Sequence, residues 1–564
     1  MLICVAAAPG GVIEATRVSE RGAPTGEARR VPAATFAAYV RDEERGDIRW
    51  VWHDTTAWYP ALLRQGVRVG RCVDLRLCHA ILRHSSLSAG SELALAPPCR
   101  WDALSPAGAE PIGGHEALFE VDDAAEMTDA AGTLDPVAEF AAQCSAVAGA
   151  SQPARLQLLL TAESAGALVA AELRHAGLPW RHEVHEAFLA DTLGPRPRAG
   201  ERPVKVESLA NEVRTALGAP QLNPDSPAEV LKALRVAGLN ATSTRSWELK
   251  KLEHPAIAPL LEYKKRARLL SANGWAWQDA WVQGGRFHAE YMPGGVVTGR
   301  WAARGGGALQ LPKQVRHAVV ADEGWKLVVA DAAQLEPRVL AGLASDEAMA
   351  AAGRGRDLYT GIVESGAVAE RAHAKVAMLG AMYGATTGES ARLMPALTRA
   401  FPRAIRLVEQ AARAGERGDV VTSRLGRSSP RPGAKWVEAQ SRASVESSRP
   451  DDERRARSQA REWGRFTRNF IVQSSAAEWA LCWMAQLRMR LADMVPAGTP
   501  VEQGPHLVYF LHDEVMVHTP EVLADRVAEA VSQCAAAAGR LLFGGFPVEF
   551  PVTTAIVDSY ADAK

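Results

Sequence analysis

The sequence predicts a multidomain protein of the α/β and α+β classes, and three observations support this prediction. The chain has 564 residues, which is too many for a single hydrophobic core. Its composition, 47% hydrophobic and 23% charged, is that of an ordinary globular protein. Runs typical of strands occur before residue 100 and after residue 320, whereas helical periodicity dominates residues 156–290. We therefore expect three or four domains or subdomains.

The first expected unit is a small α/β domain over residues 1–100. The stretch MLICVAAAPGG lacks a basic leader and indicates a first strand. The stretches IRWVWHD and CVDLRLCHAIL then continue the pattern of strand and helix.

An acidic segment follows this unit. Between Trp101 and Pro153 there are ten acids and no Lys or Arg, with turn-rich stretches such as SPAGAEPIGG. This composition predicts a surface connection or a thinly packed subdomain over residues 101–155. The formal net charge of −1 therefore conceals a basic remainder, which suits a polyanionic partner such as nucleic acid.

Residues 156–290 carry three helical patterns. ESAGALVAAELRHAGLPW is the first, and SPAEVLKALRVAGL is the second, with Ser226 as its cap and Pro227 in its first turn. The third, APLLEYKKRARLLSANG, has a cluster of cations. A solvated helix face and a phosphate-contacting face explain this cluster equally well. Its members are Lys264, Lys265, Arg266 and Arg268.

A second basic segment lies between Arg424 and Arg468, with twelve basic and six acidic residues among Ser, Pro and Gly. We expect a mobile, loop-like segment that is electrostatically suited to a polyanion. The seven cysteines have neither zinc-site spacing nor the density of a disulfide scaffold, so a reduced, cytoplasmic setting is expected. No run of about 18 apolar residues occurs, so we expect no membrane partner.

The stretch FLHDEVMVHTP places three polar residues, His512 to Glu514, between two apolar runs typical of strands. We expect a hairpin that presents these residues at the edge of a sheet, although a solvated hairpin tip explains the triplet alone. In KLVVADAAQLEPRVLAGLAS we expect a short strand over Leu327–Ala330 that ends at Asp331, followed by a helix. The simpler interpretation of Asp331 alone is that it caps this helix. If the two strands are neighbours, Asp331 and Asp513 converge and would suit magnesium ions.

A helical stripe lies between these two stretches in ERAHAKVAMLGAMYGATTG. Arg371, Lys375, Leu379 and Tyr383 recur at every fourth position, so they share one helix face. The stripe is either a solvated surface or a nucleotide-binding face, with its cations on a triphosphate and its apolar end on sugar and base.

These three stretches, in this order, resemble motifs A, B and C of the family A DNA polymerases. Motif A is DAAQLEPR, which contains Asp331, Gln334, Glu336 and Arg338; motif B is the helix from Arg371 to Gly384; motif C is HDE. TGRWAA, LQLP and GRFTRNFIVQSSAAE are further matches, and the similarity extends from about residue 155 to the C-terminus. The resemblance implies a right-hand polymerase with a thumb at 156–290, a palm at 291–350 and 469–564, and fingers at 351–468 that include the charged loop.

The resemblance also implies roles for the matching residues. Asp331 and Asp513 would bind two Mg²⁺ ions, for which Mn²⁺ could substitute, with Glu514 close by. Arg371 and Lys375 would hold the triphosphate, and Lys375 would donate a proton to pyrophosphate. Glu336 would exclude a ribose 2′-hydroxyl, and Gln334, Leu379 and Tyr383 would also face the nucleotide. The residues expected at primer or template are Arg300, Gln310, Arg465, Asn469, Gln473 and His512.

Several positions depart from the family pattern. Leu379 replaces an aromatic ring, Ala332 and Ala333 replace polar or aromatic neighbours of Asp331, and Phe510 replaces a Gln. These departures bear on efficiency and sugar selection more than on the reaction itself.

Residues 1–100 resemble the ribonuclease H-like 3′–5′ exonuclease domain of the same polymerases. That chemistry needs four carboxylates, but the first strand has no acid before Glu14, Trp58 or Ala57 occupies another expected Asp position, and Asp54 is offset. We expect a retained fold that has lost its catalysis.

The expected function is template-directed addition of deoxynucleotides to a primer 3′ end, in replication or repair. Primer-template DNA and deoxynucleoside triphosphates are the expected partners of a monomer located at the bacterial nucleoid. The alternatives are a polymerase with residual exonuclease activity, an RNA-making enzyme on the same palm, which Glu336 disfavours, and a non-catalytic DNA-binding scaffold.

Overall fold

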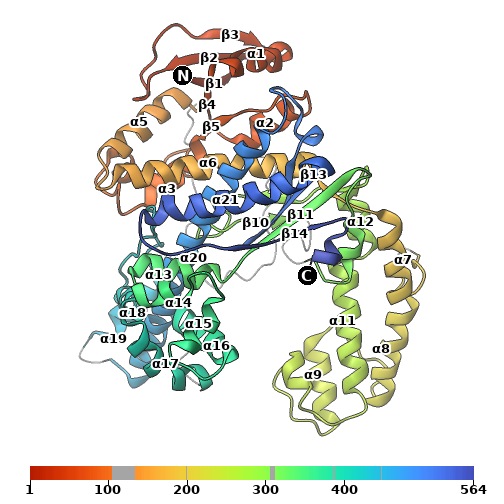
Figure 1. Ribbon diagram of the computed structural model, residues 1–564. Helices are drawn as coiled ribbons and strands as arrows, with labels where there is room; N and C mark the ends of the chain where they lie inside the picture. The colour runs from red at the N-terminus through yellow and green to blue at the C-terminus, as the bar shows by residue number, and fades with distance from the viewer. Residues whose placement is uncertain (105–133, 199, 305–310, 385–387, 446–447, 564) are drawn as a thin grey trace. The chain divides into compact units, whose positions relative to one another are not determined.

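The computed structural model describes residues 1–104, 134–198, 200–304, 311–384, 388–445 and 448–563. The chain divides into two compact units (Figure 1). The larger unit comprises residues 1–176, 291–302 and 328–556, and the smaller unit comprises residues 177–290, 303–327 and 557–564. The mixed α/β class predicted for the whole chain is confirmed.

The larger unit begins with a five-stranded mixed sheet. Its strands are β1 (Leu2–Ala8), β2 (Val12–Val18), β3 (Arg29–Pro32), β4 (Arg49–Trp52) and β5 (Arg71–Asp74). Their order is β3-β2-β1-β4-β5, with β2 antiparallel to β1 and β3, and β4 parallel to β1 and β5. Helices α1 (Phe36–Glu43), α2 (Thr55–Leu63), α3 (Leu75–His84) and α4 (Glu92–Leu95) complete this part.

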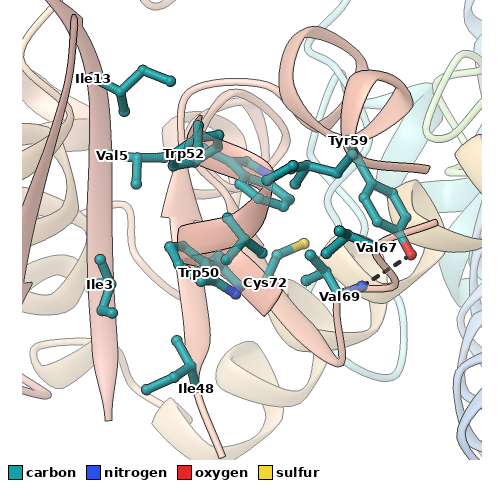
Figure 2. Close-up of a cluster of buried hydrophobic side chains, with 14 of the residues drawn as sticks. Ile3, Val5, Ile13, Ile48, Trp50, Trp52, Tyr59, Val67, Val69 and Cys72 are labelled. Carbon is teal, nitrogen blue, oxygen red and sulfur yellow. Dashed lines mark hydrogen bonds between the residues drawn. The ribbon is translucent and has the colours of Figure 1, made fainter. Parts of the chain in front are cut away.

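Both faces of the central strands are buried. Alternate residues of β1 enter different clusters, Ile3 and Val5 on one face and Cys4 on the other, as the two-residue period of a strand requires. Figure 2 shows the first cluster, in which Trp50 and Trp52 of β4 are fully buried. This double burial explains why the strands are apolar runs in the sequence.

The predicted acidic connection is only partly a connection. Residues 105–133 lie outside the described residues, but helix α5 (Pro136–Ala148) begins with Asp135 as its N-cap and buries Phe140 against Cys4 and Leu75. The prediction overlooked this helix because Pro136 and Asp135 were counted as turn signals, whereas together they form a helix start.

Helix α6 (Pro153–Ala176) belongs to the larger unit, where it packs against α2, β5 and α20, so the smaller unit begins after the predicted thumb boundary of residue 156. By length and composition this helix could cross a membrane. Its sequence has no uninterrupted apolar run of 18 residues, so the sequence pattern did not indicate this. Its most apolar window has a mean hydropathy of 1.3 and is 72% buried inside the protein. A buried core helix has the same composition.

A four-stranded sheet carries the candidate site. Its order is β12 (His506–Leu511), β13 (Glu514–Pro520), β11 (Trp325–Ala332) and β14 (Val552–Val557). Helix α21 (Ala524–Phe543) packs against β13 and against the 43-residue helix α20 (Pro450–Ala492). The predicted palm boundary at residue 469 falls inside α20.

The remaining helices of the larger unit follow β11. They are α13 (Leu335–Ala344), α14 (Glu347–Ala352), α15 (Leu358–Glu364), α16 (Arg371–Tyr383), α17 (Gly388–Ala400), α18 (Pro402–Glu416) and α19 (Ala434–Ala443). The loop predicted over residues 424–468 is largely wrong, because α19 packs on α20 and α20 begins at Pro450. Asp451, Asp452 and Glu453 in the first turn of α20 complement the helix dipole, and the Arg-rich remainder has high helix propensity.

The smaller unit is mainly helical. It contains α7 (His182–Leu193), α8 (Val204–Ala216), α9 (Pro227–Val236), α10 (Ser246–Leu249), α11 (Ile257–Asn273) and α12 (Trp275–Trp281). Helices α8 and α11 lie side by side (Figure 1). The predicted start of α9 is confirmed, since the Ser226 side chain accepts a hydrogen bond from the Glu229 N–H and Pro227 follows it.

Short strands complete the structure. Strands β6 (Leu178–Pro179), β8 (Arg286–Phe287) and β7 (Val282–Gln283) form a small antiparallel sheet in the smaller unit. Strands β9 (Glu290–Met292) and β10 (Ala302–Arg304) pair with each other.

Candidate active site

The hairpin predicted from FLHDEVMVHTP is confirmed. Strands β12 and β13 are antiparallel, Leu511 pairs with Glu514, and His512 and Asp513 form the turn. The Asp513 N–H donates to the Leu511 carbonyl over 2.6 Å, and His512 between them has a φ of +55°. A three-residue turn with positive φ at its centre is rare and strained, so the surrounding structure must hold it in place.

The predicted convergence of Asp331 and Asp513 is also confirmed at the level of the backbone. Strands β13 and β11 are neighbours, and the N–H of Ala332 donates to the Asp513 carbonyl over 2.8 Å. Asp331 was predicted to end its strand, and β11 continues one residue past it, to Ala332. Glu514, the first residue of β13, is buried.

This edge of the sheet has the donor set of a divalent-cation site. Of its three carboxylates, Asp513 and Glu514 are consecutive at the start of β13, and Asp331 precedes Ala332, whose N–H bonds to the Asp513 carbonyl. Mg²⁺ and Mn²⁺ prefer such hard oxygen ligands, so the residues present fit a divalent cation.

A cavity of about 160 Å³ opens beside this edge. Its polar lining contains five of the residues singled out from the sequence, namely Arg300, Gln334, Glu336, His512 and Asp513, and Leu379 belongs to its apolar lining. Its apolar lining includes Trp301, Tyr359, Met382, Met484 and Phe510. The cavity therefore combines a few ionisable groups with apolar and aromatic walls, as ligand sites commonly do.

Glu336, in the first turn of α13, is the centre of a hydrogen-bond network. Arg300 forms an ion pair with it, and the Tyr383 hydroxyl donates to Glu336 Oε2 over 2.9 Å. The Gln473 amide in turn donates to the Tyr383 hydroxyl over 3.4 Å. Burial and the Glu336 carboxylate raise the pKa of Tyr383, so the hydroxyl stays protonated and can donate.

The helix predicted to carry the cationic stripe is α16, which begins at Arg371 and ends at Tyr383 before Gly384, whose φ is +72°. The Arg371 guanidinium pairs with Asp357 over 2.8 Å and lies over the ring of Tyr359, 5.5 Å from its centroid. Burial favours a raised pKa for Asp357, but the Arg371 and Thr360 hydrogen bonds outweigh it and lower that pKa. Asp357 is therefore a stable anion.

Lys375 is exposed one turn further along α16. Among the described residues, no hydrogen-bond or ion-pair partner is seen for it, so its ammonium group is available to an external anion. Leu379 follows on the same face, half-buried in the cavity lining. The stripe thus runs from Arg371 at the helix start to the cavity.

The residues predicted at primer or template occupy different settings. Arg465 is exposed next to the end of α16, where a Cβ on Gly384 would lie 2.9 Å from Arg465 Cγ. The buried Oδ1 of Asn469 has no hydrogen-bond partner among the described residues. Burial and the nearby Arg300 lower the pKa of His512, so its imidazole is neutral at pH 7. Gln310 lies outside the described residues.

Arg338 was noted in the sequence only as part of a motif, and the structure gives it a role. The side chain is 1% exposed, and its guanidinium donates to four backbone carbonyls, those of Ala333, Gly353, Arg356 and Glu549. It therefore fixes the segment after β11 to the loop before α15.

Asp357 and Tyr359 were missed. Asp357 accepts hydrogen bonds from both Arg371 and Gln334, over 2.8 and 3.0 Å, and so links the helix of the stripe to the segment after β11. Its only signal in the sequence is an Asp three residues before a Thr, which predicts a helix cap and no contact with Arg371.

The N-terminal sheet contains a second group of carboxylates. Asp54 caps α2, accepting from the Thr56 N–H over 2.9 Å, and pairs with Arg76 over 3.3 Å. Asp74 caps α3 and accepts from the Leu77 and Thr55 N–H groups over 3.0 and 2.8 Å. Strand β1 has no acid. Both carboxylates are therefore occupied by helix caps and by an arginine.

Comparison with solved structures identifies the fold. The chain is similar to the POL domain of Pol1 from M. smegmatis, a structure in complex with DNA primer-template and dNTP, with a TM-score of 0.68 and 17% sequence identity. The similarity covers 100% of this chain and 96% of that one, so the mixed α/β fold is that of a polymerase domain.

The family is defined by sequence. A profile of the family described as DNA polymerase family A matches residues 200–562, more than half of the chain. The chain therefore belongs to DNA polymerase family A.

Two curated relatives illustrate the distance within the family. The thermostable DNA polymerase I of Thermus aquaticus is 25% identical over 356 residues, which cover 58% of this chain and 39% of the relative. DNA polymerase I of Chloroflexus aurantiacus is 28% identical over 330 residues, which cover 53% of this chain and 32% of the relative. The chain thus matches less than half the length of these relatives.

Proposed function

We propose that this chain is a template-directed DNA polymerase that adds deoxynucleotides to a primer 3′ end, in replication or repair. The observation that carries the proposal is the backbone contact between Ala332 and Asp513, which brings Asp331 and Asp513 to one sheet edge in a family A chain. Its substrates are primer-template DNA and deoxynucleoside triphosphates, and it acts as a monomer in the cytoplasm, at the nucleoid.

Asp331 and Asp513 would hold two Mg²⁺ ions, or Mn²⁺ in their place, with Glu514 beside them. Bound there, two divalent ions activate an attacking hydroxyl oxygen and stabilise the leaving oxygen in phosphoryl transfer. Because the Ala332–Asp513 hydrogen bond joins the two strands, the carboxylates are positioned before substrate binds, which reduces the entropic cost of the reaction.

The residues of α16 act on the triphosphate. Lys375 is exposed and binds its phosphates, and it is the group that can donate a proton to pyrophosphate. Arg371 can contact the phosphates only if it releases Asp357. Because the Arg371–Asp357 ion pair is partly exposed to solvent, replacing one anionic partner with another costs little free energy. Leu379 and Tyr383 face the sugar and base.

Residues in and around the cavity would select the sugar and contact the duplex. Glu336, fixed by Arg300 and Tyr383, occupies space that a ribose 2′-hydroxyl would need. The residues that we place at the minor groove of primer and template are Arg300, Gln310, Arg465, Asn469, Gln473 and His512. The neutral imidazole of His512 can donate or accept a hydrogen bond at a base edge.

Primer extension tests this function. Asp331→Asn and Asp513→Asn should each lower the rate of nucleotide addition at least a thousandfold and leave primer-template affinity within about threefold, because phosphate contacts elsewhere supply binding. Asp525→Asn, on the exposed start of α21, is the matched control and should extend primers normally. Near-normal extension by either site variant would refute the proposal, and faster extension with ribonucleotides would replace it with RNA synthesis.

We also propose that residues 1–100 are a ribonuclease H-like exonuclease domain without catalysis. The strand order β3-β2-β1-β4-β5 supports the fold, and the capping of Asp54 and Asp74 and the pairing of Asp54 with Arg76 support the loss. The protein should leave a 3′-labelled single strand undigested in Mg²⁺ or Mn²⁺. Degradation that disappears in Asp54→Ala or Asp74→Ala would contradict this.

A further inference from the structure

A buried histidine on α3 lies between two carboxylates, far along the chain from the polymerase motifs. His79 is 3% exposed, with Nδ1 2.8 Å from Glu139 Oε1 of α5 and Nε2 3.3 Å from Asp102 Oδ1. Cys99 belongs to the same cluster, because one ligand atom each from His79, Cys99 and Asp102 lie within 4.8 Å of one another. These residues play no part in the proposed polymerase chemistry.

The three residue types and their separations fit a zinc ion. Zinc binds nitrogen, thiolate sulfur and carboxylate oxygen at about 2.0 to 2.3 Å, which places the ligand atoms of a tetrahedron roughly 3.5 Å apart. The distance of 3.3 Å between His79 Nε2 and Asp102 Oδ1 is close to this ligand separation. It is longer than the N···O distance of a good hydrogen bond, which is about 2.9 Å. Because the ligand atoms lie within 4.8 Å of one another, Cys99 would have to move toward the pair by at most about 1.3 Å.

The surroundings supply the partners that zinc ligands usually have. A ligating histidine commonly donates its second ring N–H to a carboxylate, and Glu139 accepts from Nδ1 here. The Gln143 amide donates to Glu139 over 2.6 Å and fixes it. Asp102 is oriented in the same way by Arg83, over 3.1 Å, and by the backbone N–H of Cys99, over 2.7 Å.

The charges of the cluster also match a divalent cation. With a neutral imidazole and a Cys99 thiolate, the acids Asp102 and Glu139 and the cation Arg83 leave two negative charges, which one Zn²⁺ neutralises. A protonated His79 and a neutral thiol would reach the same balance without any metal. The two states differ in whether a thiolate–metal bond exists.

We propose that His79, Cys99 and Asp102 bind one Zn²⁺ ion, with water in the fourth position and Glu139 orienting His79. Cys99 and Asp102 precede residues 105–133 in the chain and Glu139 follows them, so the ion, with the His79–Glu139 contact, would tie the chain on both sides of residues 105–133 to α3. The site stands apart from the proposed polymerase function and does not depend on it.

The full chain, freed of metal with a chelator, is titrated with Zn²⁺ and with Co²⁺ as a spectroscopic probe. We expect the wild-type chain to bind one Zn²⁺ ion more than the Cys99→Ser variant binds. Co²⁺ should give a thiolate-to-cobalt charge-transfer band, and Zn²⁺ should raise the Tm by on the order of a few degrees. Cys99→Ser should remove the band and lower zinc affinity at least tenfold. Cys144→Ser, at the half-buried cysteine of α5, is the matched control and should change neither.

The thiolate band separates this site from metals at the polymerase carboxylates, which have no sulfur ligand. Absence of the band in the wild-type protein overturns the proposal and leaves a metal-free ionic cluster around His79. A band that survives in Cys99→Ser but disappears in Cys144→Ser also overturns it, because another thiol is then the ligand. Primer extension by Cys99→Ser should equal that of the wild type, so a failure of the polymerase proposal is recognised independently.

Discussion

Replacing Leu379 with phenylalanine should lower the KM for the incoming deoxynucleotide about tenfold and change kcat little. Leu379 is half-buried in the cavity wall and lies one turn after Lys375 on the same face of α16. An aromatic ring there would stack flat on the nucleotide, whereas leucine offers only apolar volume.

The expected decrease in KM follows from the free energy of stacking an aromatic ring on the nucleotide. Stacking on a base is worth about 1–3 kcal/mol, and each 1.4 kcal/mol is tenfold in binding. Leu379 borders a cavity of about 160 Å³, so the added ring has open space beside it, and overpacking should remove only part of this gain. A gain near the lower end of the range, about tenfold, is expected. Since the ring contacts ground state and transition state alike, it supplies uniform binding and leaves kcat almost unchanged.

The assay is steady-state primer extension over a range of nucleotide concentrations, which gives KM and kcat separately. Val376→Phe, which adds a ring at an exposed position of α16 outside the cavity lining, is the control and should leave both parameters unchanged. An unchanged or raised KM in Leu379→Phe would refute the reasoning, and the apolar end of the stripe would then belong to the helical core.

Three further predictions concern buried or site carboxylates. Glu336→Ala should raise ribonucleotide incorporation relative to deoxynucleotide incorporation at least tenfold in primer extension, since it removes the group that excludes the 2′-hydroxyl; an unchanged ratio would contradict this role. Arg488→Leu removes the guanidinium 2.7 Å from the buried Glu172, whose pKa is about 2, and leaves Arg68 as its remaining ion-pair partner; it should lower the free energy of unfolding in urea by about 1.5–3 kcal/mol, and a loss below about 1 kcal/mol would show that the pair contributes little. Burial raises the pKa of Glu478 from 4.5 to about 7. Between these two pH values the folded state keeps a proton that the unfolded state has released, so the free energy of unfolding is highest below pH 4.5 and falls as the pH rises to 7. Glu478→Gln should abolish this loss, which is about 3 kcal/mol, in urea titrations at several pH values, whereas an identical pH profile in wild type and variant would assign the dependence to other groups.

The parts of the site that could be predicted from the sequence depend on local pattern. The apolar runs before Asp331 and after Glu514 predicted strands, and the four-residue spacing from Arg371 to Tyr383 predicted one helix face. Each of these signals reflects a backbone period that is repeated along a few residues. The neighbouring positions of Asp331 and Asp513 followed only once both stretches were assigned to one sheet.

The parts that could not be predicted depend on contacts between distant segments. Asp357 looks like a helix cap in the sequence, and its bonds to Arg371 and Gln334 exist only because two helices and a strand end meet. The helical start of α20 was missed for a different reason, because its many charges were attributed to a solvated loop although arginine and glutamate favour helices.

The departures from the family pattern around the carboxylates are explained by packing. Phe510, where the family usually has Gln, is buried edge-on against Trp301, with ring centroids 5.0 Å apart, and its N–H donates to the Tyr291 hydroxyl over 3.2 Å. Ala332 is buried as well, and its backbone rather than its side chain contacts Asp513. An apolar side chain at each position therefore suits its buried setting. The carboxylates keep their positions through backbone hydrogen bonds that any residue can make, so these substitutions change the wall of the cavity and leave the proposed metal-binding edge intact.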